Sequence, residues 1–116
     1  AMELDERQGM VEEYLDTLLP ENWNDMDVYA RRSFIVDKDA PTSPKGVVRR
    51  ETVSNAEIWV ECFGRNFSEL KIADSYALAA LMTSVSGWER TQVKKRIPIY
   101  GEQRLYVRVV AEDKVQ

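Results

Sequence analysis

The sequence contains no histidine, and Cys62 is the single cysteine among its 116 residues. Without imidazole, the chain lacks the usual acid–base group near neutral pH and the commonest nitrogen ligand for a metal. One cysteine cannot form an internal disulfide, so a reducing compartment such as the cytoplasm is expected. With no histidine to activate it, Cys62 is better interpreted as a packed core thiol than as a nucleophile.

Long apolar runs and phosphate-binding loops are absent as well. No apolar run approaches the roughly 20 residues needed to cross a bilayer, and there is no signal-peptide pattern, so we expect no membrane partner. Lys45 and Gly46 are not followed by the rest of a phosphate-binding loop. The acidic residues between 3 and 27 recur at exposed helical positions rather than in a cleft. We therefore expect no metal, no cofactor and no enzymatic activity from this chain.

Charge is distributed unevenly along the chain, whose net charge is −4. Residues 1–30 hold nine acidic residues and one basic residue, whereas residues 31–110 hold fourteen basic and nine acidic residues. The stretch 87–108 alone carries six cations against two carboxylates. Binding responds to the local field of a patch rather than to the total charge, so an acidic protein can still present a basic surface.

The first 46 residues predict a helical segment. Apolar residues at three-to-four spacing predict a helix over 5–19, ended by Pro20. Its buried stripe would be Met10, Val11, Tyr14, Leu15, Leu18 and Leu19. A second helix over 27–35 would be capped by Asp25 or Asp27. Its buried members would be Trp23, Met26, Tyr29 or Ala30, and Phe34. Arg31 and Arg32 fit ion pairs with the acidic first helix better than phosphate contacts, and residues 37–46 predict a loop.

Residues 47–86 predict a short strand over 47–51 and then two helices. The sequence Ser54-Asn55-Ala56-Glu57 is a capping box that opens a mostly buried helix, and Gly64 is a plausible left-handed stop. After a connection with one turn near residues 68–70, Asp74 or Ser75 would cap a helix over 75–85. Its buried stripe would be Leu78, Leu81, Met82 and Val85, and its opposite face would present Ser75, Tyr76, Ala79 and Thr83.

Residues 87–108 predict a basic β-hairpin directly after that helix. Leu105, Val107 and Val109 alternate with Arg104, Tyr106 and Arg108, which is the period of a half-buried strand. Residues 88–91 would be its antiparallel partner. The bend would lie either in a basic tip over 92–96 or at Tyr100-Gly101, and the pattern does not choose between them.

The order of these elements predicts a winged-helix-like fold. The class is α+β, mostly helical: a helix-turn-helix followed by a β-hairpin wing, with extra N-terminal helices. Residues 1–46 would form the N-terminal helical segment, 47–110 the winged-helix-like domain and 111–116 a tail, all within one compact unit.

Several segments resemble the C-terminal end of the virulence-associated E family. They are Ala56–Gly64 (AEIWVECFG), Lys71–Ser75 (KIADS), Gly87-Trp88 and Tyr100–Arg108 (YGEQRLYVR), together with Leu18–Trp23 (LLPENW) and Arg31-Arg32 further upstream. That family comprises P-loop helicase or primase-helicase proteins of phages, prophages and mobile islands. The ATPase motifs of the family are missing here. The resemblance therefore implies a non-catalytic accessory domain of a bacterial, phage- or mobile-element-encoded replication helicase, with the ATPase domain of a longer parent protein as one partner.

The leading hypothesis is DNA binding, with a preference for double strands and weak sequence specificity. The nucleic-acid-binding residues would be Arg49, Arg50, Lys71, Ser75, Tyr76, Thr83, Arg90, Lys94, Lys95, Arg96, Gln103, Arg104 and Arg108. The helix over 75–85 contains no Arg, Lys, Asn or Gln to read base edges, so the wing would carry most of the affinity. The alternative is a protein-interaction module that docks to a helicase motor or a replication partner through its acidic first helix.

Overall fold

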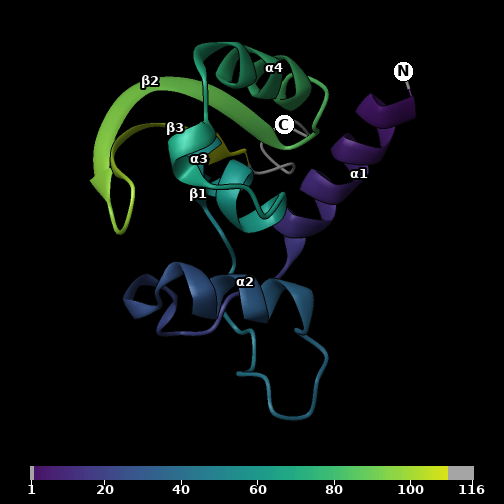
Figure 1. Ribbon diagram of the computed structural model, residues 1–116, viewed down its shortest axis with the longest axis vertical. Helices are drawn as coiled ribbons and strands as arrows, with labels where there is room; N and C mark the ends of the chain where they lie inside the picture. Colours follow the sequence, from purple (N-terminus) through teal and green to yellow (C-terminus); the bar gives the residue numbers. More distant parts are fainter. Residues whose placement is uncertain (1, 110–116) are drawn as a thin grey trace, which may run out of the picture.

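The computed structural model describes residues 2–109, and these form an α+β fold. Four α-helices accompany a three-stranded antiparallel sheet in the order β1-β3-β2. Figure 1 shows α2 and the loop after it at one end of the molecule, and α4 with the strongly curved β2 at the other. The predicted α+β class is confirmed, whereas the predicted tail over 111–116 lies outside the described residues.

Helix α1 spans Met2–Asp16 and supplies one wall of the main core. Val11, Tyr14 and Leu15 are buried, as the apolar stripe predicts. The helix ends earlier than expected, because the residue before Pro20 is held in an extended conformation. Leu19 instead exchanges backbone hydrogen bonds with Val48, and its N–H lies 2.7 Å from the Val48 carbonyl. Leu18 and Met10 are about half exposed, so their predicted burial is wrong.

A second, smaller core forms around the next two elements. The 3₁₀-helix η1 (Trp23–Asp25) precedes α2 (Val28–Val36), and the rings of Trp23 and Phe34 pack edge to face with centroids 5.9 Å apart. Of the two predicted caps, Asp27 is the one used: its carboxylate accepts from the Ala30 N–H at 2.8 Å. Tyr29 is 81% exposed, so the half-buried Ala30 takes the inner position.

The chain then crosses a loop and enters the sheet later than predicted. Residues 37–47 form turns without regular structure, as expected. The predicted strand over 47–51 is wrong: β1 is Thr52–Val53, and Val53 is buried opposite Tyr106 of β3. Among the earlier residues, Val48 forms an isolated bridge with Leu19, and the Glu51 carbonyl accepts from the Arg108 N–H at 3.0 Å.

The capping box is present and opens an unusual helix. The Ser54 N–H donates to Glu57 Oε1 at 2.8 Å, and the Glu57 N–H donates to Ser54 Oγ at 3.3 Å. Helix α3 (Asn55–Glu57) continues directly into the π-helix η2 (Ile58–Cys62). Gly64 then ends it with φ +72°, a backbone angle that favours glycine, and the Arg32 guanidinium lies 2.7 Å from the position that a Cβ would occupy.

Helix α4 spans Ile72–Met82, after a single 3₁₀ turn, η3 (Phe67–Glu69). Its start was predicted three residues too late, because Asp74 is not the cap but lies in the first turn, where its carboxylate accepts from the Lys71 N–H at 3.0 Å. The predicted buried stripe is confirmed: Leu78, Leu81 and Met82 are buried, and so is Val85 in the turn that follows.

The hairpin consists of β2 (Trp88–Ile97) and β3 (Gly101–Arg108). Its bend lies at residues 98–100, next to the predicted Tyr100-Gly101 turn, so the basic residues belong to strand β2 and not to a tip. Ile99 adopts φ +75° while the Tyr100 N–H bonds the Pro98 carbonyl at 2.9 Å, which is the strained form of a γ-turn. No helix within residues 2–109 has the length and apolar character to cross a membrane.

Candidate nucleic-acid interface

Strand β2 presents a row of exposed cations. Arg90, Lys94, Lys95 and Arg96 are exposed, and Arg104 on the neighbouring β3 is half-buried. None of these five side chains forms an ion pair with a described residue. The ion pairs between described residues all involve other side chains. Alternation along a strand would place such residues on both faces of a free-standing ribbon. The hairpin therefore carries a concentration of positive charge, on both faces, that forms no ion pair with the described residues.

The strand register brings like charges together. Lys94 lies opposite Arg104, while Arg96 lies opposite Glu102. Between Arg90 and Lys94 the register shifts, with three residues of β2 facing one residue of β3, and such bulges bend and twist a ribbon. Because two cations directly opposite each other destabilise a sheet, the Lys94 and Arg104 pair is not explained by hairpin stability.

A groove separates α4 from the base of the hairpin. It measures about 370 Å³ and brings together three of the predicted site residues, Tyr76, Thr83 and Arg90. Tyr106 forms part of its wall, and its hydroxyl donates to Asn55 Oδ1 at 2.8 Å. Burial raises the pKa of Tyr106, while the nearby Arg90 charge opposes that shift. Helix and hairpin thus face each other across a cleft with a cation on one side.

Arg50 was predicted to contact phosphate, and the structure contradicts this. Arg50 is 3% exposed, and its guanidinium lies over the Tyr14 ring, 4.3 Å from the centroid. It also lies 5.6 Å from the Trp23 centroid, so it connects the two cores through cation–π contacts. A guanidinium held in this way is not available to a ligand at the surface.

Arg108 was predicted to face outward from the returning strand, and it faces inward instead. Its Nη2 donates to the Leu15 carbonyl at 2.8 Å, and its Nε donates to the Arg50 carbonyl at 2.7 Å. The guanidinium also lies 4.7 Å from the centre of the Trp88 ring. The error arose because Tyr106 and Arg108 share the face that meets the core, so the apparently polar face of β3 is an inner one.

The remaining predicted residues are spread around this surface. Arg49 and Lys71 are exposed, but neither lines the groove. Ser75 is half-buried, and its carbonyl accepts from the Asn55 amide at 3.5 Å. Gln103 donates to the Tyr100 carbonyl at 3.2 Å, which ties its side chain to the hairpin bend. The structure therefore concentrates the candidate site on β2, Arg104 and the outer face of α4.

Sequence reasoning missed a buried charged centre at Glu61. Its carboxylate is fully buried and accepts three hydrogen bonds: from Tyr14 at 2.7 Å, from Arg31 at 2.7 Å and from Tyr100 at 2.8 Å. Arg31 therefore pairs with η2 rather than with α1, and the prediction for it is corrected. Arg32 is half-buried, and its guanidinium donates to the Glu61 carbonyl at 2.6 Å. The available signal was a lone acid inside the apolar stretch 58–63.

This centre also anchors the hairpin. Tyr100 sits at the bend and reaches into the core, where its ring meets Phe67 edge to face at 5.4 Å. Burial, followed by the charge of Glu61, raises the pKa of Tyr100. Burial likewise raises the pKa of Tyr14, so both hydroxyls remain donors to the carboxylate over the ordinary pH range. The far end of the hairpin is thus held to the body of the protein.

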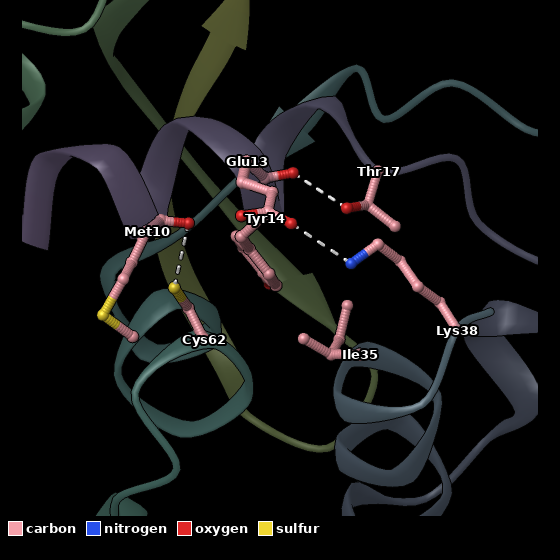
Figure 2. Close-up of a pocket in the computed structure, with 7 residues that line it drawn as sticks. All are labelled: Met10, Glu13, Tyr14, Thr17, Ile35, Lys38 and Cys62. Carbon is pink, nitrogen blue, oxygen red and sulfur yellow. Dashed lines mark hydrogen bonds and ion pairs between the residues drawn. The ribbon is translucent and has the colours of Figure 1, made fainter. Parts of the chain in front are cut away.

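A small cavity between α1, α2 and η2 contains the single thiol (Figure 2). Cys62 Sγ lies 3.6 Å from the Met10 carbonyl, and Lys38 closes one side through an ion pair of 3.3 Å with Glu13. Burial raises the pKa of the Cys62 thiol to about 12, so the nucleophilic thiolate is scarce at neutral pH. The prediction of a packed core thiol is confirmed.

Comparison with known protein families finds no family model that matches this chain, and comparison with curated proteins finds no significant match. Within the described residues, no group of three or more acidic or cysteine side chains is arranged to hold a metal ion.

Proposed function

We propose that this chain is a DNA-binding module whose hairpin lies along the phosphate backbone. The observation that carries the proposal is the row of exposed cations on β2 at Arg90, Lys94, Lys95 and Arg96. None of them forms an ion pair with a described residue, and only Arg96 has a carboxylate residue, Glu102, opposite it in the register. Phosphate contacts of this kind drive binding by releasing condensed counterions. The partner is double-stranded DNA. It binds at a surface that is locally positive although the net charge of the chain is negative.

The same proposal includes a winged-helix architecture. Helix α1, strand β1, the pair α3–η2 and α4, and the β2–β3 hairpin follow one another in the order that a helix-turn-helix with a wing requires. The sheet order β1-β3-β2 supports this reading, because the first strand closes onto the returning strand of the hairpin. Helix α2 and its loop are then an addition between the first helix and the first strand.

In this arrangement α4 positions the module more than it reads bases. Within Ile72–Met82 there is no Arg, Lys, Asn or Gln, which are the side chains that form paired hydrogen bonds with base edges. Ser75, Tyr76 and Thr83 lie on or beside the outer face, and Tyr76 is 70% exposed. Binding is therefore weakly specific, with Arg49 and Lys71 as additional phosphate contacts beside the helix.

The biological setting that we propose follows from the resemblance to the virulence-associated E family. The chain would be a non-enzymatic accessory domain of a phage or mobile-element replication helicase, working in the bacterial cytoplasm beside an ATPase domain. The resembling segments include Ala56–Gly64 and Tyr100–Arg108, which contain Glu61 and Tyr100. These residues hold the hairpin to the core, so the resemblance covers the part of the molecule that positions the cations.

The experiment replaces Lys94, Lys95 and Arg96 together by alanine and measures binding to a labelled duplex by fluorescence anisotropy. Each lost phosphate contact lowers the slope of log affinity against log salt by about 1, so the slope should fall by about 3. The matched control replaces Lys38, Lys45 and Arg65, which removes the same charge from loops far from β2 in the sequence. Equal losses in both variants would refute the assignment to the hairpin.

Protein docking through the acidic helix is the second candidate. Glu6, Glu13 and Asp16 are exposed along α1, where they offer a contact for a basic partner. Deleting the first 30 residues cannot test this, because Val11, Tyr14 and Leu15 belong to the main core. Replacing Glu6 and Glu13 by lysine changes exposed side chains and costs the surface ion pair between Glu13 and Lys38, so the core should remain intact. DNA binding that is unchanged, together with loss of association with a separately expressed ATPase domain, would favour docking.

A further inference from the structure

The groove between α4 and the hairpin owes its space to two small residues. Ala79 and Ala80 lie on α4 where longer side chains would fill the cleft, and Met82 and Trp88 provide an apolar floor below them. The volume of about 370 Å³ is at the lower end of the range of roughly 300–1,000 Å³ that is typical of small-molecule sites. The groove therefore suits a single ring system better than an extended peptide.

The rim of the groove combines an aromatic face with a cation. Tyr76 is 70% exposed, so most of its ring is free to contact a ligand. Arg90 is exposed on the opposite wall, and the exposed Lys94 and Arg96 continue along the same strand. An apolar cleft beside an aromatic ring and a line of cations is the combination by which proteins hold single-stranded nucleic acid: rings stack on bases while cations follow the phosphates.

We propose that this groove receives one unpaired nucleobase, stacked on Tyr76, while Arg90 contacts an adjoining phosphate. The inference rests on the proposed DNA-binding function and adds a preference for duplexes that contain an unpaired nucleotide. The proposal also assigns α4 a role in holding an unpaired base, which is compatible with the small side chains of this helix. The helix has no side chains for reading paired bases in the major groove, yet its alanines leave room for a base that has left the stack.

The line of cations distinguishes this occupant from a protein side chain. An apolar side chain of a partner would use the floor of the groove but gain nothing from Arg90, Lys94 and Arg96. A nucleotide uses both parts, because its base is apolar on its faces and its phosphate is negative. Charge complementarity therefore favours the nucleotide.

The test compares three duplexes of identical flanking sequence. One is fully paired, one carries a single extra 2-aminopurine as a bulge, and one carries an abasic site in place of that base. Affinity is read from a dye at the far end of each duplex, and base stacking is read separately from the 2-aminopurine fluorescence. The protein is the full chain, as wild type, Tyr76→Ala, Ala79→Leu and Ile72→Ala. Ile72 is 74% exposed on the same helix but does not line the groove, so its variant is the matched control.

We expect the wild type to bind the base-bearing bulge about tenfold more tightly than the paired or abasic duplex, and to quench the 2-aminopurine. Ala79→Leu should remove this preference while leaving affinity for the paired duplex unchanged, and Ile72→Ala should behave as wild type. Tyr76→Ala should also remove the preference, which is read as the ratio of its affinities for the base-bearing bulge and the paired duplex. Equal binding of all three duplexes would overturn the base site and leave the DNA-binding proposal standing. Tight binding of the abasic bulge would also overturn it, because bending rather than base capture would then explain the preference. No binding to any duplex would refute both proposals.

Discussion

The molecule contains two clusters of charged residues, one buried and hydrogen-bonded and the other exposed. At the buried centre, Glu61 accepts hydrogen bonds from Tyr14, Arg31 and Tyr100, and no part of its side chain reaches solvent. On the hairpin, Lys94 and Arg96 are exposed and form no ion pair with a described residue. The first set of charges joins α1, α2, η2 and the hairpin bend, whereas the second projects away from them.

This difference separates charges that are satisfied within the fold from exposed charges that, in the proposed function, contact DNA. A buried carboxylate is tolerated only when its oxygens are satisfied, so removal of any donor is costly. An exposed cation on a strand contributes little to folding, and two of them opposite each other cost stability. The two regions nevertheless touch at Tyr100, through which the buried centre sets the position of the exposed strand.

The largest expected effect comes from breaking the buried pair. Arg31→Met leaves the Glu61 carboxylate uncompensated in the core, and the free energy of unfolding should fall by about 3–5 kcal/mol. Urea denaturation followed by tryptophan fluorescence measures this. The control, Lys94→Met, should change stability by no more than about 0.5 kcal/mol. The double variant Arg31→Met/Glu61→Met should recover only part of the loss, because it leaves the buried hydroxyls of Tyr14 and Tyr100 without their acceptor. The contrast between the two regions fails if Arg31→Met is as mild as its control.

An intermediate effect is expected where the two regions meet. Tyr100→Phe keeps the ring contact with Phe67 but removes a hydrogen bond to a charged group, which should cost about 1.5–3 kcal/mol. Amide exchange at the bend should become faster, while DNA affinity should change little because the cations of β2 remain. Tyr29→Phe serves as the control, since Tyr29 is exposed. Unchanged exchange at the bend in Tyr100→Phe would show that the anchor does not hold the hairpin.

The smallest expected effect concerns the ionisation of the Cys62 thiol. It should leave the free energy of unfolding unaffected at neutral pH and lower it increasingly in alkali. Its folded pKa of about 12 exceeds the value of about 8.5 for an unfolded thiol. A raised pKa means that the contribution to stability is fully present below about pH 8.5 and is lost as the pH rises toward 12. Wild type should therefore lose stability faster than Cys62→Ala between pH 9 and 11 in urea titrations. Parallel pH profiles would contradict the burial of a neutral thiol.

Local signals in the sequence were sufficient for much of the fold. The Ser54 capping box, the Gly64 stop and the stripe of Leu78, Leu81 and Met82 all depend on residues within one or two turns of each other, and all three are present. The α+β class followed from these helices and from the alternation in 104–109. Element ends were less certain, as the early end of α1 and the early start of α4 show.

The roles of individual charged residues could not be predicted in the same way. Arg31 meets Glu61 across 30 positions of sequence, and Arg108 meets Leu15 across 93, so no local pattern reveals either contact. Arg50 looked like a surface cation beside Arg49, yet it is buried over Tyr14. The groove was likewise invisible, because it depends on how α4 packs against the hairpin rather than on any one segment. The exposed row on β2 was predictable because three of its four cations, Lys94, Lys95 and Arg96, are consecutive in the sequence.

The measurement that tests the central claim most directly is the affinity of the wild-type chain for a labelled duplex at several salt concentrations, by fluorescence anisotropy. If the cations of β2 engage about three to five phosphates, log affinity should fall against log salt with a slope of roughly −3 to −4.5. Failure to bind the duplex even at low salt would contradict the account, and the basic hairpin would then have to face a protein instead.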